Sequence, residues 1–323
     1  MRAVRVHEFG DPDVLIAEQD VPVPTPSEGH VLIAVEEIGV GYGDTIVRSG
    51  RYRLALPWTP GVEVGGRVVG LGPGVDESLR NKRVVATTAG LSGGYAEYAV
   101  APAAWTFALP DGLATGTALA VFQAGALARG LLTAMRVRGD DTVLITAAAG
   151  RIGSLLVQEA KAAGCVVIGA AGGTKTGAVQ GFGADHAVDY HATDWPDQVR
   201  ALTGGRGPDV VLDGVGGPVA AQAMAAAADG AGRIGLYGYA CGEWPVLDAQ
   251  AVIRRGLTVI GALGVVLRKP EAEKRADAEH ALARAAQGAL RPRIHARLEL
   301  EQAAEAHRLL ESRSSVGAVL LTV

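Results

Sequence analysis

The chain has little of what a nucleic-acid-binding or membrane-spanning protein needs. Its formal net charge is −4, and aromatic residues make up only 5% of it. No run of lysines and arginines forms a basic stripe, so a surface that binds phosphates and stacks bases is not expected. The longest uncharged segment, residues 112–128, is shorter than a membrane span and is interrupted by Thr115, Thr117 and Gln123. We therefore expect neither nucleic acid nor a membrane among its partners.

Cysteine is also scarce, with only Cys165 and Cys241 in the chain. Both fall at expected strand starts or in loops, and we interpret both as free thiols of a reducing compartment. The strand-like alternation of residues 1–7 is not preceded by a signal-peptide core. We therefore expect a cytoplasmic location.

What the chain does have is glycine-rich turns after apolar strands, in a length of 323 residues that suffices for two domains. Residues 143–146 have the β-branched content of a buried parallel strand, and residues 152–163 switch to helical periodicity. The turn between them contains Ala148, Gly150 and Gly153, a relaxed form of G-x-G-x-x-G. Small residues there let the backbone approach a pyrophosphate, and the helix N-terminus supplies an anion site. The alternative is a tight strand-to-helix turn that binds no ligand. The predicted contacts are Ala149, Gly150, Arg151, Ile152 and Gly153.

A second strand, residues 166–170, ends in another turn of small residues. NAD enzymes place an acid at the end of this strand to hold the ribose hydroxyls, but no acid occurs from Ile168 to Thr176. Small polar residues and one lysine accommodate a 2′-phosphate instead, so the sequence favours NADPH. The predicted contacts are Gly172, Gly173, Thr174 and Lys175. The alternative for Lys175 is a solvated residue at a helix start.

Two further apolar strands end in glycines, within residues 208–217 and 232–242. Strands of a parallel sheet with glycine-rich carboxyl ends form one crevice for one ligand. Val215, Gly216, Tyr239 and Cys241 complete the predicted cofactor contacts, and packing is an alternative role for Cys241.

The rest of the chain predicts a second domain. Residues 31–43, 61–75 and 83–90 alternate and carry glycine turns, as in an antiparallel β domain. Helical spacing covers residues 113–132, a charged helix is expected over 271–286, and the chain ends in a helix and a strand. A terminal strand must join a sheet, so we expect it to return to the first domain. The prediction is an α/β protein with a Rossmann-type doubly wound parallel sheet, residues 119–261, inserted into a mostly antiparallel β domain, residues 1–118 and 262–323.

Several short strings resemble the zinc-independent, zeta-crystallin-like quinone oxidoreductases of the medium-chain dehydrogenase/reductase superfamily, over nearly the whole chain. The strings are DTIVRSGRY (44–52), GVEVGGRVVGLG (61–72), GYAEY (94–98), GADHAVDY (183–190), VLDGVGG (211–217) and AHRLLES (306–312). The resemblance implies that the β domain is a GroES-like catalytic domain. It also implies that Tyr190, with Lys175, holds the adenosine phosphate of NADPH. Zinc relatives carry a cysteine, a G-H-E string and a four-cysteine lobe, but Val62 stands where the histidine would be and no cysteine precedes Cys165. No metal is expected.

Without zinc, hydride from the nicotinamide must go to an acceptor that tolerates negative charge, such as a quinone or an α,β-unsaturated carbonyl. A hydrogen-bond donor to the acceptor oxygen is expected, and the tyrosines are the candidates. The resemblance places Tyr42, Tyr52 and Tyr95 in cleft-lining strings, although each can equally be a packing residue. Asp44 matches a family position too and is alternatively a cap or turn residue.

The chain departs from the family pattern at four positions. Gly41, Leu127 and Ala318 replace an asparagine, a threonine and a lysine, and Arg151 replaces a glycine of the pyrophosphate turn. The changes at Gly41 and Leu127 imply a roomier, more apolar nicotinamide pocket, which fits a bulky hydrophobic acceptor. The shape of this pocket depends on how Trp58, Phe122, Leu127 and Leu263 pack. The protein is then a reductase of quinones or of α,β-unsaturated carbonyls, an enoyl reductase included. The alternative is a nucleotide-binding protein with little redox activity, or a scaffold for non-redox chemistry. The apolar stretch 257–265 is expected at a sheet edge, which predicts a homodimer.

Overall fold

The computed structural model describes all residues from 1 to 323 and divides into two compact units. The first unit comprises residues 1–123 and 282–323, and the second comprises residues 124–281. The predicted boundaries lay after residues 118 and 261. The second observed boundary falls 20 residues later (281 against 261), because Val266 packs against Gly130 and Asp277 pairs with Arg129. These contacts tie residues 262–281 to the nucleotide unit.

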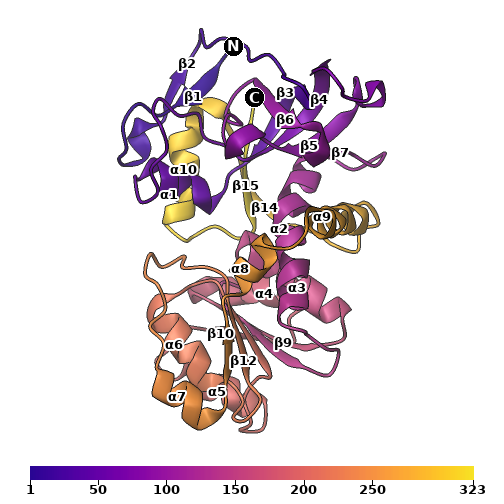
Figure 1. Ribbon diagram of the computed structural model, residues 1–323. Coiled ribbons are helices and arrows are strands. Elements are labelled where there is room, and N and C mark those ends of the chain that lie inside the picture. The colour runs from indigo at the N-terminus through magenta and orange to yellow at the C-terminus, as the bar shows by residue number, and fades with distance from the viewer. The chain divides into compact units, whose positions relative to one another are not determined.

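The first unit is built on a seven-stranded, mostly antiparallel sheet (Figure 1). Along the main path its strands are β14 (Ile294–Glu299), β15 (Ala318–Thr322), β3 (His30–Gly39), β4 (Glu63–Leu71), β5 (Arg83–Thr87) and β7 (Thr106–Ala108), and β6 (Tyr98–Pro102) pairs with β3. The C-terminal strand β15 runs antiparallel to β3 and parallel to β14. The prediction that the last strand returns to the first domain is confirmed.

Alternation along β3 explains how this sheet closes its core. Val31, Ile33 and Val35 are buried while the residues between them are half-buried, as expected for a strand with one face inward. A pair of short strands, β1 (Ala3–Arg5) and β2 (Ile16–Glu18), lies outside the main sheet. The helical segments of this unit are η1 (Pro12–Val14), α1 (Tyr42–Arg48), η2 (Glu77–Leu79), η3 (Ala89–Leu91), η4 (Ala103–Trp105), η6 (Leu300–Gln302) and α10 (Ala303–Glu311).

The second unit is a six-stranded parallel sheet in the order β10-β9-β8-β11-β12-β13. Its strands are β8 (Thr142–Ile145), β9 (Val166–Ala171), β10 (His186–Asp189), β11 (Val210–Asp213), β12 (Arg233–Leu236) and β13 (Thr258–Ile260). This is the 3-2-1-4-5-6 order of a dinucleotide-binding sheet, in which the strand order reverses between β8 and β11. All residues of β8 and β11 are buried, as in a sheet covered on both faces. The predicted fold class is confirmed.

Helices cover both faces of the parallel sheet (Figure 1). They are α3 (Arg151–Ala162), η5 (Gly173–Lys175), α4 (Thr176–Gly181), α5 (Trp195–Leu202), α6 (Gly217–Ala226), α7 (Ala249–Arg255) and α8 (Ala262–Leu267). The long helices α2 (Thr115–Ala134) and α9 (Glu271–Ala286) cross the boundaries between the units along the chain.

One strand prediction was wrong in extent. The apolar stretch 257–265 was interpreted as a strand, but β13 ends at Ile260 and Ala262 begins helix α8. A short apolar run does not distinguish strand from buried helix, and Gly261 separates the two elements here. The placement of β13 at the edge of the sheet is confirmed.

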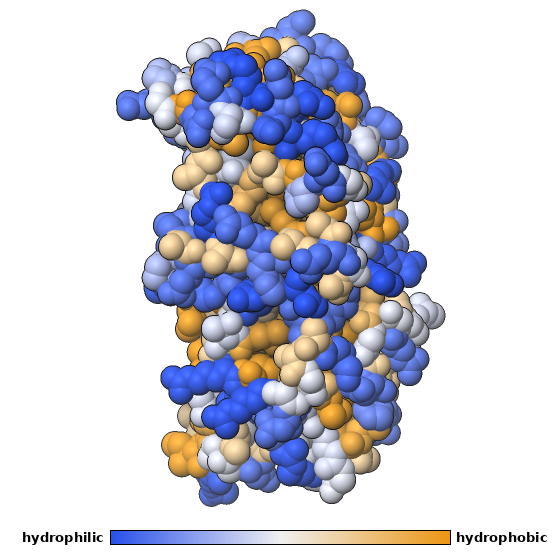
Figure 2. All heavy atoms as spheres, turned by 90° about the vertical axis from the view of Figure 1, so that its right-hand side faces the viewer, coloured by the Kyte–Doolittle hydropathy of each residue, from blue (hydrophilic) through white to orange (hydrophobic).

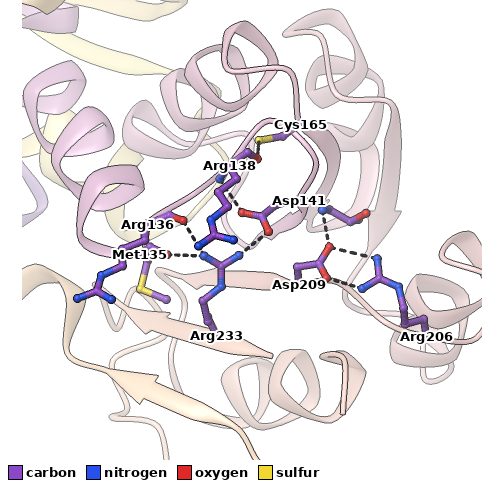
Figure 3. A network of polar contacts seen from close by, with 9 residues as sticks. Met135, Arg136, Arg138, Asp141, Cys165, Arg206, Asp209 and Arg233 are labelled. Carbon is purple, nitrogen blue, oxygen red and sulfur yellow. Dashed lines mark hydrogen bonds and ion pairs between the residues drawn. The ribbon is translucent and has the colours of Figure 1, made fainter. Parts of the chain in front are cut away.

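A network of charged side chains lies at the amino ends of the parallel strands (Figure 3). We call this side of the sheet its amino edge, and the opposite side, where the strands end, its carboxyl edge. Arg233 at the start of β12 pairs with Asp141 and donates to the carbonyl oxygens of Met135 and Arg136, at 2.8 and 2.7 Å. Asp209 pairs with Arg206 and accepts from the Thr142 N–H at 2.8 Å. Strand starts and the end of α2 are thus fixed together by charged groups that satisfy backbone polar atoms.

Helix α2 is the one helix long and apolar enough to cross a membrane, yet it is mostly buried inside the protein. Its side chains Leu119, Val121 and Phe122 are fully buried. The core helix of a globular protein can have the same length and apolar composition. The face drawn in Figure 2 is largely hydrophilic, with hydrophobic residues in separate patches.

Candidate functional site

The turn between β8 and α3 has the geometry of a phosphate-binding turn. Ala147 adopts a left-handed conformation, with φ 49°, and Gly150 caps α3. A Cβ atom on Gly153 would lie 2.1 Å from the Ala147 carbonyl oxygen, so only glycine lets the helix approach this closely. The first N–H groups of an α-helix have no partner within the helix and attract anions. The predicted contacts Ala149, Gly150, Arg151, Ile152 and Gly153 therefore form one turn whose shape suits a pyrophosphate.

The ends of β9 and β10 form the next part of the same edge. Gly172 lies against the residues that follow β10, because a Cβ atom there would be 2.6 Å from His191 Cε1 and 3.2 Å from Tyr190 Cε2. Thr174 is exposed, while Lys175 is half-buried and ends η5. The structure therefore brings the end of β9, at Gly172, next to Tyr190. The sequence prediction named these residues together for the adenosine phosphate.

An acid that the sequence prediction missed also lies here. The Asp189 Oδ1 atom accepts from the N–H groups of Gly173, at 3.0 Å, and His191, at 2.9 Å. The N–H groups of His191 and Gly173 lower the pKa of Asp189, so its carboxylate is charged at neutral pH. Asp189 is the last residue of β10. It could have been found from the rule that neighbouring parallel strands end on the same side of the sheet. The segment that follows β9 contains no acid, as predicted, but Asp189 of β10 binds to that segment.

A buried polar cluster joins β8 to β11 at the point where the strand order reverses. Thr146 Oγ1 donates to Asp213 Oδ1 at 2.6 Å and accepts from the Gly214 N–H at 3.0 Å. Asp213 also accepts from the N–H groups of Val215 and Gly216, at 3.3 and 2.9 Å. Burial raises the pKa of this fully covered acid. Thr146 and Asp213 were not predicted as site residues, yet Asp213 holds the predicted contacts Val215 and Gly216 in place and Thr146 holds Asp213.

The segment after β12 continues this edge. The N–H groups of Ala240 and Cys241 donate to the carbonyl oxygens of Gly214 and Val215, at 3.1 and 2.9 Å. Tyr239 and Cys241 are half-buried, and both cysteines are free thiols, as predicted. The carboxyl ends of β8, β9, β11 and β12 thus present the four predicted sets of cofactor residues along one edge.

The predicted tyrosines of the first unit do not share one environment. Tyr52 is 63% exposed and Tyr42, at the start of α1, is half-buried, whereas Tyr95 is fully buried. The Tyr95 hydroxyl lies 3.1 Å from His307 Nε2 and donates to Asp44 Oδ2 at 3.4 Å. The enclosed hydroxyl favours the packing role that was weighed for Tyr95. Only Tyr42 and Tyr52 remain as candidate donors.

Asp44 organises the interior around that tyrosine. Its carboxylate accepts from the N–H groups of Gly41, at 3.1 Å, and Gly61, at 3.3 Å. Burial raises the pKa of Asp44 to about 6 and lowers that of His307 to about 3. Of the two roles weighed for Asp44, the cap role is the one observed, since it bonds the N-cap residue of α1.

The four residues that were predicted to shape the pocket differ in burial and belong to different units. Trp58 and Phe122 are buried in the first unit, and Phe122 packs on Phe107 with ring centroids 5.1 Å apart. Leu127 and Leu263, in the second unit, are half-buried. Trp58 and Phe122 are therefore core residues. Ala318, where a lysine was expected, is a buried residue at the start of β15.

No group of three or more histidine, cysteine, aspartate or glutamate side chains is arranged to hold a metal ion. The expectation that the protein uses no metal stays a prediction.

Comparison with protein families gives two matches. Residues 27–111 match the alcohol dehydrogenase GroES-like domain, and residues 152–283 match the family described as zinc-binding dehydrogenase. The quinone oxidoreductase of Rattus norvegicus is 32% identical over 329 residues, covering 99% of this chain and 97% of its own.

Solved structures agree along the whole length. The Escherichia coli quinone oxidoreductase complexed with NADPH is 27% identical, with a TM-score of 0.92, and a mycobacterial protein complexed with NADPH is 33% identical, with a TM-score of 0.91. Each match covers 100% of both chains. This chain therefore belongs to the quinone oxidoreductase family of the medium-chain dehydrogenase/reductase superfamily.

Proposed function

We propose that the protein is an NADPH-dependent oxidoreductase that transfers hydride to a quinone or to an α,β-unsaturated carbonyl. The observation that carries this proposal is the full-length similarity to quinone oxidoreductases, two of whose solved relatives hold NADPH. The glycine turn after β8 fits the same cofactor, since the space in front of Gly153 admits no side chain.

The residues of the second unit have separate tasks in binding NADPH. The N–H groups at the start of α3 hold the pyrophosphate, while Thr174, Lys175 and Tyr190 hold the adenosine phosphate. The segment from Tyr239 to Cys241 lies at the nicotinamide end, because a dinucleotide crosses such a sheet where the strand order reverses. NADPH supplies a hydride, which with one proton converts a quinone to a hydroquinone or saturates a conjugated double bond.

The protein must also stabilise the negative charge that develops on the acceptor oxygen. A tyrosine hydroxyl that donates to this oxygen does so without a metal. Tyr42 and Tyr52 are the candidates, because Tyr52 is exposed and Tyr42 is half-buried, whereas Tyr95 is fully buried. No bound metal is part of the proposal.

Two measurements test the proposal. Purified protein is titrated with NADPH and with NADH by fluorescence. 1,4-Benzoquinone or a 2-alkenal is then added while the absorbance of the reduced cofactor is followed. We expect tighter binding of NADPH than of NADH, and oxidation by at least one acceptor class. Binding without oxidation by any acceptor would favour a nucleotide-binding protein with little redox activity, and no binding would reject the proposal.

A homodimer remains part of the proposal. Strand β13 lies at an edge of the parallel sheet, and such edges are commonly covered by pairing across a two-fold axis. Gel filtration coupled to light scattering should give twice the chain mass of 33.0 kDa. A monomer at micromolar concentration would reject this part alone.

A further inference from the structure

An exposed aromatic pair stands on the segment between β12 and α7. The rings of Tyr239 and Trp244 are stacked, with centroids 3.9 Å apart and planes inclined by 30°. Trp244 is 68% exposed, and the nearby residues Val246 and Leu247 are 82% and 47% exposed. Large apolar side chains gathered on a surface commonly mark a binding site. Tyr239 covers one face of the Trp244 ring, and the exposed part of the ring can stack on a planar ligand.

The segment that carries the pair is held in one conformation by the turn after β11. The Gly217 N–H donates to the Glu243 carbonyl oxygen at 3.1 Å, in addition to the bonds from Ala240 and Cys241. Gly216 and Gly217 have φ values of 80° and 48°. A Cβ atom on Gly216 would lie 2.4 Å from the Glu243 carbonyl oxygen and 3.0 Å from Tyr239 Cα. The two segments are in close contact, so the aromatic pair is preorganised rather than carried on an untethered loop.

The position of the aromatic pair on the sheet determines which part of a bound dinucleotide lies near it. The pyrophosphate turn follows β8 and the adenosine residues follow β9, so the reactive half of the dinucleotide extends the other way, toward the ends of β11 and β12. The chain from Tyr239 to Trp244 directly follows the end of β12 and bonds to the end of β11. If NADPH binds as proposed above, the aromatic pair therefore lies at the nicotinamide end of the carboxyl edge.

The charge next to the pair limits the charge of the ligand. The exposed Glu243 directly precedes Trp244, whereas the Asp248 carboxylate is used to cap α7, where it accepts from the N–H groups of Gln250 and Ala251. An acid next to an aromatic surface disfavours an anionic ligand. A neutral planar ring system suits both the stacking surface and this charge.

We propose that Trp244, supported by Tyr239, is the residue on which the acceptor stacks, and that it makes fused-ring quinones better substrates than single-ring quinones or aliphatic enals. This inference rests on the proposed function and adds the class of acceptor to it. The stacking face grows from one ring to two between 1,4-benzoquinone and 1,4-naphthoquinone, so the preference should follow ring count.

The test compares Trp244→Ala and Trp244→Phe with the unaltered protein. The kcat/KM for 1,4-naphthoquinone should fall about tenfold in Trp244→Ala, mainly through KM, and about threefold or less in Trp244→Phe, because an aromatic face is worth on the order of one tenfold step in affinity. For 1,4-benzoquinone and 2-hexenal the loss should be smaller. Ile253→Ala is the matched control, because Ile253 is 79% exposed in the same unit. It should behave as the unaltered protein with every acceptor.

A second measurement does not depend on turnover. With NADP⁺ bound, 1,4-naphthoquinone should quench tryptophan fluorescence, and the quenching should be weaker in Trp244→Phe. Equal losses with all acceptors, together with a shift from dimer to monomer in light scattering, would mean that a second copy of the chain covers Trp244, and would overturn the inference. Unchanged naphthoquinone kinetics in Trp244→Ala would overturn it too while leaving the proposed function intact. An unaltered protein that binds NADPH but reduces no acceptor would reject both.

Discussion

At the amino edge of the parallel sheet, Arg233 pairs with Asp141 and Asp209 pairs with Arg206, and these groups also bind backbone atoms (Figure 3). At the carboxyl edge, the strands of the same sheet end in glycines and short polar side chains. There the polar contacts are made mainly to backbone N–H groups, as at Asp213 and Asp189. Charged side chains fill space and fix strand starts, whereas glycines leave room for a ligand to approach the backbone. The two edges thus separate stability from binding within one small sheet.

The claim that one edge serves binding and the other stability is tested most directly by adding one methyl group at each edge. In Gly153→Ala the new Cβ would lie 2.1 Å from the Ala147 carbonyl oxygen, so the phosphate turn must open. We expect the Kd for NADPH to rise about 100-fold, equivalent to about 2.8 kcal/mol. Fluorescence titration measures it.

Gly139→Ala is the matched control at the amino edge, where a Cβ would lie 2.7 Å from the Ala163 carbonyl oxygen. It should lower the thermal midpoint while NADPH affinity stays within twofold. If both variants lose affinity equally, the functional separation of the edges is wrong.

The amino edge is probed by Arg233→Ala. This change removes a pair whose side chains are 23% and 9% exposed and leaves Asp141 covered without its arginine. We expect a loss of about 2 kcal/mol in the free energy of unfolding, below the full value for a buried pair because water reaches this one. Urea unfolding followed by circular dichroism measures it.

The control for that variant is Arg206→Ala. Arg206 is 56% exposed in its pair with Asp209, so its loss should cost less than about 1 kcal/mol. NADPH affinity should remain unchanged in both variants. A large loss of affinity in Arg233→Ala would show that the amino edge also shapes the binding site.

Lys175→Ala tests the carboxyl edge by charge rather than shape. If Lys175 binds the 2′-phosphate, the Kd for NADPH should rise about tenfold, the usual order for one charge-assisted contact near a surface. The Kd for NADH should change less than twofold. Lys274→Ala, which removes an exposed pair on α9, is the control and should alter neither value. An equal loss for both cofactors would place Lys175 away from the phosphate.

The doubly wound parallel sheet, its insertion into the β domain and the return of the last strand to the first domain were predictable because apolar strands and glycine turns repeat along the chain. The burial of Tyr95 was not, because its partners Asp44 and His307 lie 51 and 212 residues away. The same limit applies to Thr146 and Asp213, which are 67 residues apart. Hydrophobic periodicity and the spacing of glycines predict single helices and strands. Side-chain contacts between distant segments can be predicted only once the order of the strands in the sheet is known.

Asp189 shows this limit most clearly and gives the smallest expected effect. The sequence favoured NADPH because no acid ends β9, yet the structure brings this carboxylate from β10 to the same loop. Asp189→Asn keeps an oxygen that accepts from Gly173 and His191 but removes the charge. It should therefore tighten NADPH about two- to threefold at low salt, with little effect at high salt or on NADH. Asp189→Ala removes the loop contacts as well and should weaken both cofactors. If the asparagine variant binds NADPH no better than the alanine variant, the charge of Asp189 does not act on the cofactor, and its role is confined to shaping the loop.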